Sequence, residues 1–288
     1  MPELDAPVVA ATTKKRGGRD LRVAVPVGLG LLAIVGVSLF ISKAYFIIVA
    51  ALAVGLAMWE LDQALSRKGI RIPVVPLAVG GAGVCISSYQ IGLEGLLIAC
   101  VLTIVAAVVW RLMEGGGQGA VRDLTGIAFA VAYLPLMAGF VVIILAEPGG
   151  QYRVALLLLL AVASDVGGFF AGVFLGKHPL APSVSPKKTW EGLAGSFALA
   201  IAVALVGAKL IGIDPISAAM LGIIVPVTAT LGDLGESLLK RDLGLKDMGS
   251  LLPGHGGVLD RIDSMLLTAP FVYVVFAVAD RMSAVAGG

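Results

Sequence analysis

Five acidic side chains in the C-terminal half of this sequence are the groups best suited to do chemistry. Asp165 lies inside a long apolar segment, and four other acids form pairs spaced three residues apart, Asp233 with Glu236 and Asp260 with Asp263. Residues three apart on a helix share one side, so each pair would project together. Converging carboxylates repel one another, and Mg²⁺ relieves the repulsion because it prefers oxygen ligands. We therefore predict that all five acids bind Mg²⁺, with room for a second cation.

Basic side chains accompany these acids in nearly equal number. The alternative to a metal site is that the acids only form ion pairs with their neighbours Lys240, Arg241 and Arg261. Over residues 164–191 and 233–263 together, seven cationic side chains face eight anionic ones. A region close to neutrality, with both signs clustered, suits a metal bound together with a polyanion.

Two further stretches have the composition of phosphate sites. The stretch "PGHGG" (253–257) can take positive φ angles and present successive N–H groups to an anion. The stretch "SPKKTWEG" (185–192) offers two lysines beside two hydroxyls. A simple turn and a solvated basic loop are the alternatives, and Trp190 could either anchor at a membrane interface or stack on a base. The predicted phosphate-binding residues are Ser185, Lys187, Lys188, Thr189, His255, Gly256 and Gly257.

The segments that must position these residues are membrane helices. The chain is 58% hydrophobic and 14% charged, with a mean hydropathy of +1.00, which is typical of a polytopic membrane protein. A helix needs about 20 apolar residues to cross roughly 30 Å of hydrocarbon. This rule predicts an all-α protein with about nine spans, near 22–42, 44–61, 72–90, 93–110, 124–146, 153–176, 192–213, 216–238 and 264–280.

The distribution of basic residues predicts the orientation of these spans. With the N-terminus in the cytoplasm, all but four of the 21 Lys and Arg residues fall on the inner side, as expected of cytoplasmic segments. The exceptions are Lys43, Arg153, Lys209 and Arg281. Both polar blocks, at 177–191 and 239–263, then face the cytoplasm and would border a polar cavity. Asp165 would lie roughly 16 Å deep in its span, where an ionised group costs about 3 kcal/mol. This cost favours a functional residue over a structural ion pair.

The remaining segments receive simpler interpretations. Residues 1–21 read as a disordered basic cytoplasmic tail, in preference to a signal peptide. The N-terminal spans occupy 22–146, and the C-terminal region, 147–288, carries the catalytic residues. Cys85 and Cys100 are read as small packing residues, and the glycines at 168, 172 and 176 as a close-packing stripe.

The C-terminal polar block resembles the signature of the phosphatidate cytidylyltransferases, also called CDP-diglyceride synthases. The preceding segments "SD…GKHPLAPSVSPKKTWEG" and "GDLGES" are similar to the family in the expected order, so the resemblance covers about residues 160–265. The sequence departs from the family at Val166, Gly168 and Phe169. The signature is matched without a gap by Ser237, Lys240, Arg241, Lys246, Asp247, Gly249, Leu252, Pro253, His255, Gly256, Gly257, Asp260, Arg261 and Asp263.

The resemblance implies transfer of a cytidylyl group from CTP to phosphatidate, giving CDP-diacylglycerol and pyrophosphate. It implies catalysis at the inner face of the cell membrane by a multi-pass protein, and it suggests a homodimer. The expected partners are CTP, phosphatidate and membrane lipid, with no nucleic acid. On this basis we assign Lys246 to phosphate binding, and we assign to catalysis Asp233, Asp260, Asp263, Lys240 and Arg261.

Two other functions stay open at this point, and a third is disfavoured. A CTP-dependent lipid kinase would use similar phosphate chemistry, and product analysis separates the two reactions. A transporter with a midplane ion site is also compatible with polar residues in glycine-interrupted spans, although neither polar block is repeated. A CDP-alcohol phosphotransferase would require a D-G-x-x-A-R opening, which this sequence lacks.

Overall fold

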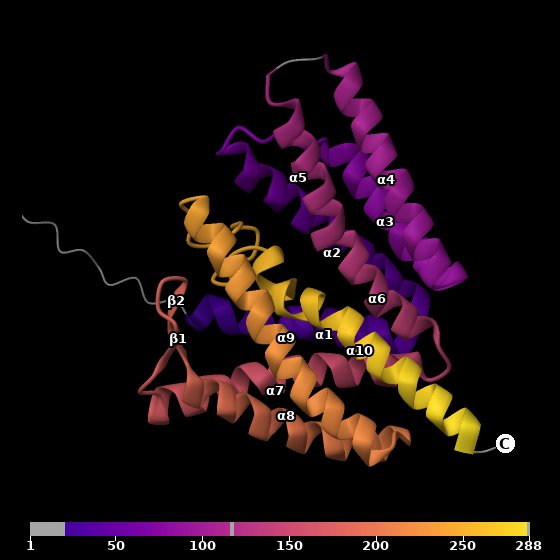
Figure 1. Cartoon of the computed structure of the whole chain (residues 1–288), viewed down its shortest axis with the longest axis vertical. Helices are drawn as coiled ribbons and strands as arrows, with labels where there is room; N and C mark the ends of the chain where they lie inside the picture. The colour runs from indigo at the N-terminus through magenta and orange to yellow at the C-terminus, as the bar shows by residue number, and fades with distance from the viewer. Residues whose placement is uncertain (1–20, 116–117, 287–288) are drawn as a thin grey trace, which may run out of the picture.

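The computed structural model describes residues 21–115 and 118–286 and is a bundle of helices with one small hairpin (Figure 1). The predicted tail, 1–21, lies outside the described residues except for its last residue, where α1 begins. In chain order the elements are α1 (Leu21–Ile41), α2 (Lys43–Ser66), α3 (Val74–Ile91), α4 (Leu93–Met113), α5 (Ala120–Tyr133), α6 (Pro135–Ala146), α7 (Gly150–Leu175), β1 (Pro179–Ala181), β2 (Ser185–Thr189), α8 (Trp190–Ile211), α9 (Pro215–Asp242) and α10 (Leu259–Ala286).

The predicted all-α membrane fold is confirmed. Each of the nine apolar segments coincides with a helix, or with the pair α5 and α6 in the case of 124–146. Within the described residues, eight helical stretches are long and apolar enough to cross a membrane, and Val25–Ile41 is a shorter apolar helix. The exact number of crossings and their orientation stay predictions. Cys85 and Cys100 are free and buried, as expected of packing residues.

The segment predicted as 124–146 is divided between Tyr133 and Pro135. Proline has no N–H to donate to the preceding turn, and its ring disfavours helical backbone at the residue before it. Leu134 accordingly has φ −105° and ψ −78° and separates α5 from α6. Tyr133 therefore sits at a break in the middle of a buried apolar stretch.

The glycine stripe of α7 packs against α8 inside the same chain. A Cβ built on Gly168 would lie 2.6 Å from Ser196 Oγ, and one built on Gly172 would lie 3.4 Å from Thr189 Oγ1. Small residues allow helix backbones to approach closely, as the stripe predicts. The two helices lie side by side along one edge of the bundle (Figure 1).

Replacing Gly168 with Val should destabilise the α7–α8 pair. The added methyl groups overlap Ser196, and overpacking of this kind costs about 1–3 kcal/mol. Thermal unfolding of the purified protein in detergent should show a lower midpoint than the wild type. Gly83→Val is the matched control, because a Cβ at Gly83 meets nothing within 4 Å. Equal midpoints for the two variants would contradict the proposed close contact.

The two polar blocks are more regular than expected from the sequence. The first contains the antiparallel β1–β2 hairpin, and α8 begins directly after it, with Thr189 Oγ1 accepting a hydrogen bond from Gly192 N at 3.1 Å. In the second, α9 continues to Asp242 and α10 begins at Leu259, so only residues 243–258 form the connecting loop. Lys240 and Arg241 in the last turn of α9 suit the negative end of its dipole.

Close packing of α9 on α10 places the two acidic pairs opposite each other. A Cβ on Gly232 would lie 2.9 Å from the backbone oxygen of Asp263 and 3.0 Å from Ser264 Cα, so only glycine fits between the helices.

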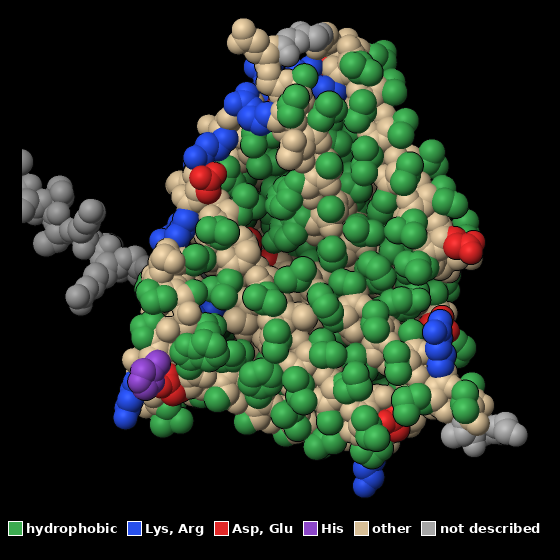
Figure 2. Space-filling model, viewed as in Figure 1, with side chains coloured by type: hydrophobic (Ala, Val, Ile, Leu, Met, Phe, Trp, Pro, Cys, Tyr) green, Lys and Arg blue, Asp and Glu red, His purple; other side chains and the backbone are tan. Residues whose placement is uncertain are grey.

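Figure 2 shows an apolar face with Lys and Arg side chains gathered along the edge where the hairpin and the α9–α10 loop lie in Figure 1.

Candidate active site

A polar cavity of about 590 Å³ lies between α7, β2, α9 and α10. Five carboxylates and three basic side chains line it, in a bundle whose core is mainly apolar. The structure therefore brings all five predicted acids to one place. The lining residues are Asp165, Phe169, Lys188, Asp233, Glu236, Ser237, Lys240, Asp260, Arg261, Asp263 and Ser264.

A second cavity of about 190 Å³ adjoins the first and extends beneath the hairpin towards α8. The two cavities share Asp165, Phe169, Lys188 and Asp233. The smaller one is also lined by the predicted phosphate-binding residues Lys187 and Thr189 and by two buried serines, Ser164 and Ser196. Because they share four lining residues, the two cavities form one continuous region.

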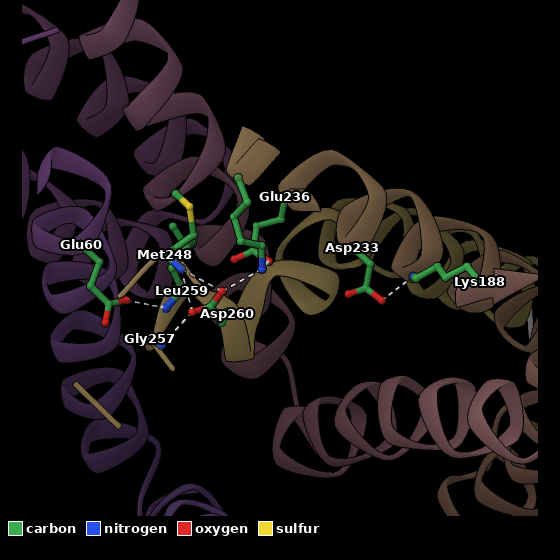
Figure 3. Close-up of polar contacts among 9 residues, drawn as sticks. Glu60, Lys188, Asp233, Glu236, Met248, Gly257, Leu259 and Asp260 are labelled. Atoms are coloured by element: carbon green, nitrogen blue, oxygen red, sulfur yellow. Dashed lines mark hydrogen bonds and ion pairs between the residues drawn. The ribbon is translucent and has the colours of Figure 1, made fainter. Parts of the chain in front are cut away.

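Lysines already pair with three of the five acids. Lys188 Nζ lies 2.5 Å from Asp233 Oδ2, so an ion pair joins the hairpin to α9 (Figure 3). Lys240 Nζ contacts both Glu236 and Asp260, at 2.8 Å from Asp260 Oδ1. Of the ion pairs expected as an alternative to a metal, Lys240 with Asp260 is present, whereas Asp233 pairs with Lys188 and Arg261 forms no ion pair among the described residues. Arg241 is not part of them; its Nε donates to the carbonyl of Val184 and ties the hairpin to the end of α9.

The other two acids have no such partner. In the described part of the chain, neither Asp165 nor Asp263 forms an ion pair with Lys, Arg or His. Glu236 Oε1 is buried without a hydrogen-bond partner, and the Asp263 carboxyl lies beside the Glu236 carboxyl. A buried carboxylate oxygen with no donor is costly, and a bound cation would satisfy it.

This arrangement has the donor chemistry of a magnesium site without being assembled as one. Among the described residues, no three His, Cys, Asp or Glu side chains converge as metal ligands. Carboxylate oxygens are nevertheless what Mg²⁺ prefers, usually one or two of them together with substrate phosphates. The residues therefore have the oxygen donors to fit a cation that binds together with a phosphorylated substrate.

The loop at residues 243–258 has the backbone expected of an anion nest, but its amides bind the protein's own groups. Gly254 and Gly256 have φ of 77° and 86°. Gly256 N donates to the Leu252 carbonyl at 3.1 Å, and Gly257 N donates to Asp260 Oδ2 at 2.7 Å. Because these donors are already used, the expected phosphate contacts of the Gly256 and Gly257 amides are not available in this structure.

Comparison with known proteins adds a second line of evidence. The sequence pattern of the family described as "Cytidylyltransferase family" matches residues 22–279, which is most of the chain. The chain belongs to the cytidylyltransferase family. A Mycobacterium bovis protein named phosphatidate cytidylyltransferase is 38% identical over 279 residues, covering 92% of this chain and 91% of the relative.

Other relatives in the family carry the same name. The Mycobacterium leprae phosphatidate cytidylyltransferase is 37% identical over 270 residues, or 88% of this chain and 86% of the relative. A Brucella abortus phosphatidate cytidylyltransferase is 39% identical over 143 residues, or 48% of this chain and 53% of the relative. The resemblance found in the C-terminal polar block thus extends over almost the whole chain.

Several residues expected in this cytidylyltransferase site lie away from the cavity walls. Ser185 is paired with Ala181 in the hairpin. Lys246 is exposed in the 243–258 loop. His255 is half-buried against α1, where a Cβ on Gly28 would lie 3.2 Å from His255 Nε2, and its Nδ1 is buried without a partner. These residues flank the site instead of lining either cavity.

Two residues of the N-terminal half belong to the site region and were missed by the sequence analysis. Glu60 on α2 is 1% exposed and accepts hydrogen bonds from the 243–258 loop and the start of α10. Among the residues described, the buried hydroxyl of Tyr133 has no hydrogen-bond partner, and Tyr133 interacts electrostatically with Glu236 and Asp263. Glu60 could have been found, because an acid within an apolar span is unusual for the same reason as Asp165.

Proposed function

We propose that this chain transfers a cytidylyl group from CTP to phosphatidate, giving CDP-diacylglycerol and pyrophosphate. The observation that carries the proposal is the cavity of about 590 Å³, in which five carboxylates meet three basic side chains within an apolar bundle. Its size suits a small-molecule site. Membership of the cytidylyltransferase family and the shared name of the relatives support the same reaction.

The basic side chains would reduce the repulsion between the two substrates. Two unit negative charges 5 Å apart repel by about 3 kcal/mol at an effective dielectric of 20, and a phosphate monoester and a triphosphate present several such pairs. Lys188, Lys240 and Arg261 line the cavity and can neutralise phosphate oxygens as charge develops on the leaving group. Lys187 and Thr189 can hold further oxygens in the adjoining cavity.

The reaction needs little proton chemistry from the protein. A phosphatidate oxygen, already an anion near neutral pH, forms a new bond to the α-phosphorus of CTP. The bond from that phosphorus to the bridging oxygen breaks, and pyrophosphate leaves with the electron pair. The contribution of the chain is therefore to position the two substrates and to balance their charge.

Magnesium would be held by the carboxylates that face the cavity. Among the described residues, Asp165 and Asp263 have no ion-pair partner, Asp233 pairs only with Lys188, and Glu236 Oε1 is buried without a hydrogen-bond partner. Bound there, Mg²⁺ would neutralise nucleotide phosphates. Asp260 differs, because its oxygens already accept from Lys240, from Met248 N at 3.0 and 3.1 Å, and from Gly257 N. We therefore assign Asp260 to positioning the 243–258 loop.

The location and assembly of the enzyme form part of the proposal. The cavity is bordered by the hairpin, by the last turns of α9 and by the first turns of α10, which the distribution of Lys and Arg predicts to face the cytoplasm. Phosphatidate would then enter from the inner face of the cell membrane, and CTP from the cytoplasm. The homodimer suggested by the resemblance stays a prediction, because the glycine stripe that could have supported it packs within the chain.

Removal of divalent cations should stop the reaction. Purified protein in detergent, given radiolabelled CTP and phosphatidate with Mg²⁺, should form a cytidylylated lipid and release pyrophosphate. A chelator should reduce turnover to background, and added Mg²⁺ should restore it, because the cavity carboxylates otherwise repel the substrate phosphates. Turnover that survives chelation would contradict the metal proposal. Release of CDP with a phosphorylated lipid would instead indicate the kinase, and CTP-independent uptake into liposomes would indicate the transporter.

A further inference from the structure

We propose that Glu60 is a positioning residue for cytidylyl transfer, which holds the 243–258 loop and the first turn of α10 in their active geometry. The inference rests on the proposed function, but the contact that carries it does not. Glu60 lies on α2, in the N-terminal half of the chain, whereas the residues proposed to bind substrate and metal lie on α7, β2, α9 and α10.

Both oxygens of the Glu60 carboxylate are used to hold the start of α10. Glu60 Oε1 accepts a hydrogen bond from Val258 N at 3.0 Å. Its Oε2 accepts one from Leu259 N at 2.9 Å, which Figure 3 shows. The first N–H groups of a helix have no partner within it. A side chain from a distant helix therefore does here what an N-cap residue ordinarily does for its own helix.

The charge of Glu60 has no cationic side chain to balance it. Across residues 21–115 and 118–286, no Lys, Arg or His forms an ion pair with this carboxylate, although the residue is 1% exposed. Two backbone amides and the positive end of the α10 dipole stabilise it instead. Because only these amides hold the buried carboxylate, its burial is favourable only when the loop keeps this conformation.

Two glycines of the loop leave the space that the carboxylate occupies. A Cβ on Gly257 would lie 2.5 Å from Glu60 Oε2, and a Cβ on Gly249 would also overlap the carboxylate. Neither glycine has a positive φ, so the backbone does not require glycine at either position. The requirement comes from the close approach of Glu60.

A continuous set of polar contacts joins Glu60 to the cavity. Glu60 holds Val258 and Leu259, and the adjacent Gly257 N donates to Asp260, which in turn pairs with Lys240. Arg261 follows directly on the same turn and lines the cavity. Loss of the Glu60 contact would therefore allow the residues that face the substrates to shift. A displacement of about 1 Å costs on the order of 100-fold in rate.

The test is Glu60→Gln, which keeps the volume of the side chain but retains only one oxygen acceptor. We expect kcat to fall by about 10- to 100-fold, with KM for CTP and phosphatidate changed by less than about threefold. Hydrogen exchange in residues 247–259 should become at least about tenfold faster, as expected on loss of hydrogen bonds, while exchange in α3 and α4 stays as in the wild type. Glu94→Gln, at an exposed acid in the first turn of α4, is the matched control and should leave both measurements unchanged.

A second variant tests the same contact from the loop side. Gly257→Ala should inactivate the enzyme, because the added Cβ meets Glu60. In a Glu60→Ala background that overlap is gone, so adding Gly257→Ala should cost much less than it does in the wild type. Additive losses would overturn the proposal, because independent sites behave additively.

The results separate this inference from the proposed function. If hydrogen exchange in residues 247–259 of Glu60→Gln is as slow as in the wild type, the inference is overturned. Faster exchange with an unchanged kcat would also overturn it. If the wild-type chain forms no cytidylylated lipid, the proposed function fails. Exchange in the 247–259 segment then still decides whether Glu60 holds the loop, because that measurement needs no substrate.

Discussion

Replacing Asp263 with Asn should lower CTP-dependent turnover by about 10³-fold, equivalent to about 4 kcal/mol of transition-state stabilisation. Asp263 is 6% exposed, lines the cavity, and has the Glu236 carboxyl as its neighbour. Asn keeps the shape of the side chain but removes the charge that we propose attracts Mg²⁺. The measurement is the initial rate of cytidylylated-lipid formation from radiolabelled CTP at saturating Mg²⁺.

The same variant should fold at least as stably as the wild type. Removing one of two neighbouring buried carboxylates relieves their repulsion, so the thermal unfolding midpoint in detergent should stay equal or rise. Asp242→Asn is the control for activity, since Asp242 is exposed at the end of α9 and its ion pair with Lys68 is a surface one at 3.5 Å. Retention of more than a tenth of the wild-type rate by Asp263→Asn would rule out a role as metal ligand.

Replacing Lys240 with Met should both inactivate and destabilise the protein. The Lys240 ammonium lies between Glu236 and Asp260, and its side chain is 16% exposed. Breaking a buried ion pair by removing one partner costs about 3–5 kcal/mol, because the other charge is left uncompensated. Thermal unfolding should therefore show a clearly lower midpoint, together with loss of turnover.

Two comparisons sharpen this prediction. Lys209→Met removes an exposed lysine in the last turn of α8 and should leave stability unchanged. Added Mg²⁺ should recover part of the stability of Lys240→Met, because a ligand that binds only the folded state stabilises it. A wild-type midpoint for Lys240→Met would show that the ion pair contributes nothing to the fold.

Local signals in the sequence were sufficient for the helices and for the five acids that line the cavity. An apolar run of about 20 residues predicts a helix, because inside a bilayer the backbone N–H and C=O groups can pair only with each other. Every predicted span coincides with a helix or a pair of helices. The break at Pro135 was not predicted, and proline alone does not decide it, because Pro26, Pro226 and Pro270 lie inside helices. Both polar blocks were too long as predicted, because helix ends carry charged residues that hydropathy assigns to loops.

The pairing of the acids required the tertiary structure. Spacing predicted that Asp233 and Glu236, and likewise Asp260 and Asp263, share a helix face, but not which acids would be paired with lysine. That choice depends on the approach of α9 to α10 at Gly232 and on the hairpin that delivers Lys188 to Asp233. The same holds for the glycine-rich loop at 253–257. Its composition predicts that its amides bind an anion, but not whether that anion is a substrate phosphate or a side chain of the protein.

By itself, the sequence determined a helical membrane protein and predicted a polar site for phosphates and cations. Both follow from local features, because hydropathy, charge and glycine content are properties of a few neighbouring residues. Only the tertiary structure decided that Glu60, 199 residues before Leu259, completes the start of α10, and that Asp260 holds a loop. Such contacts depend on which helices lie side by side, and no local pattern encodes the partner of a buried carboxylate.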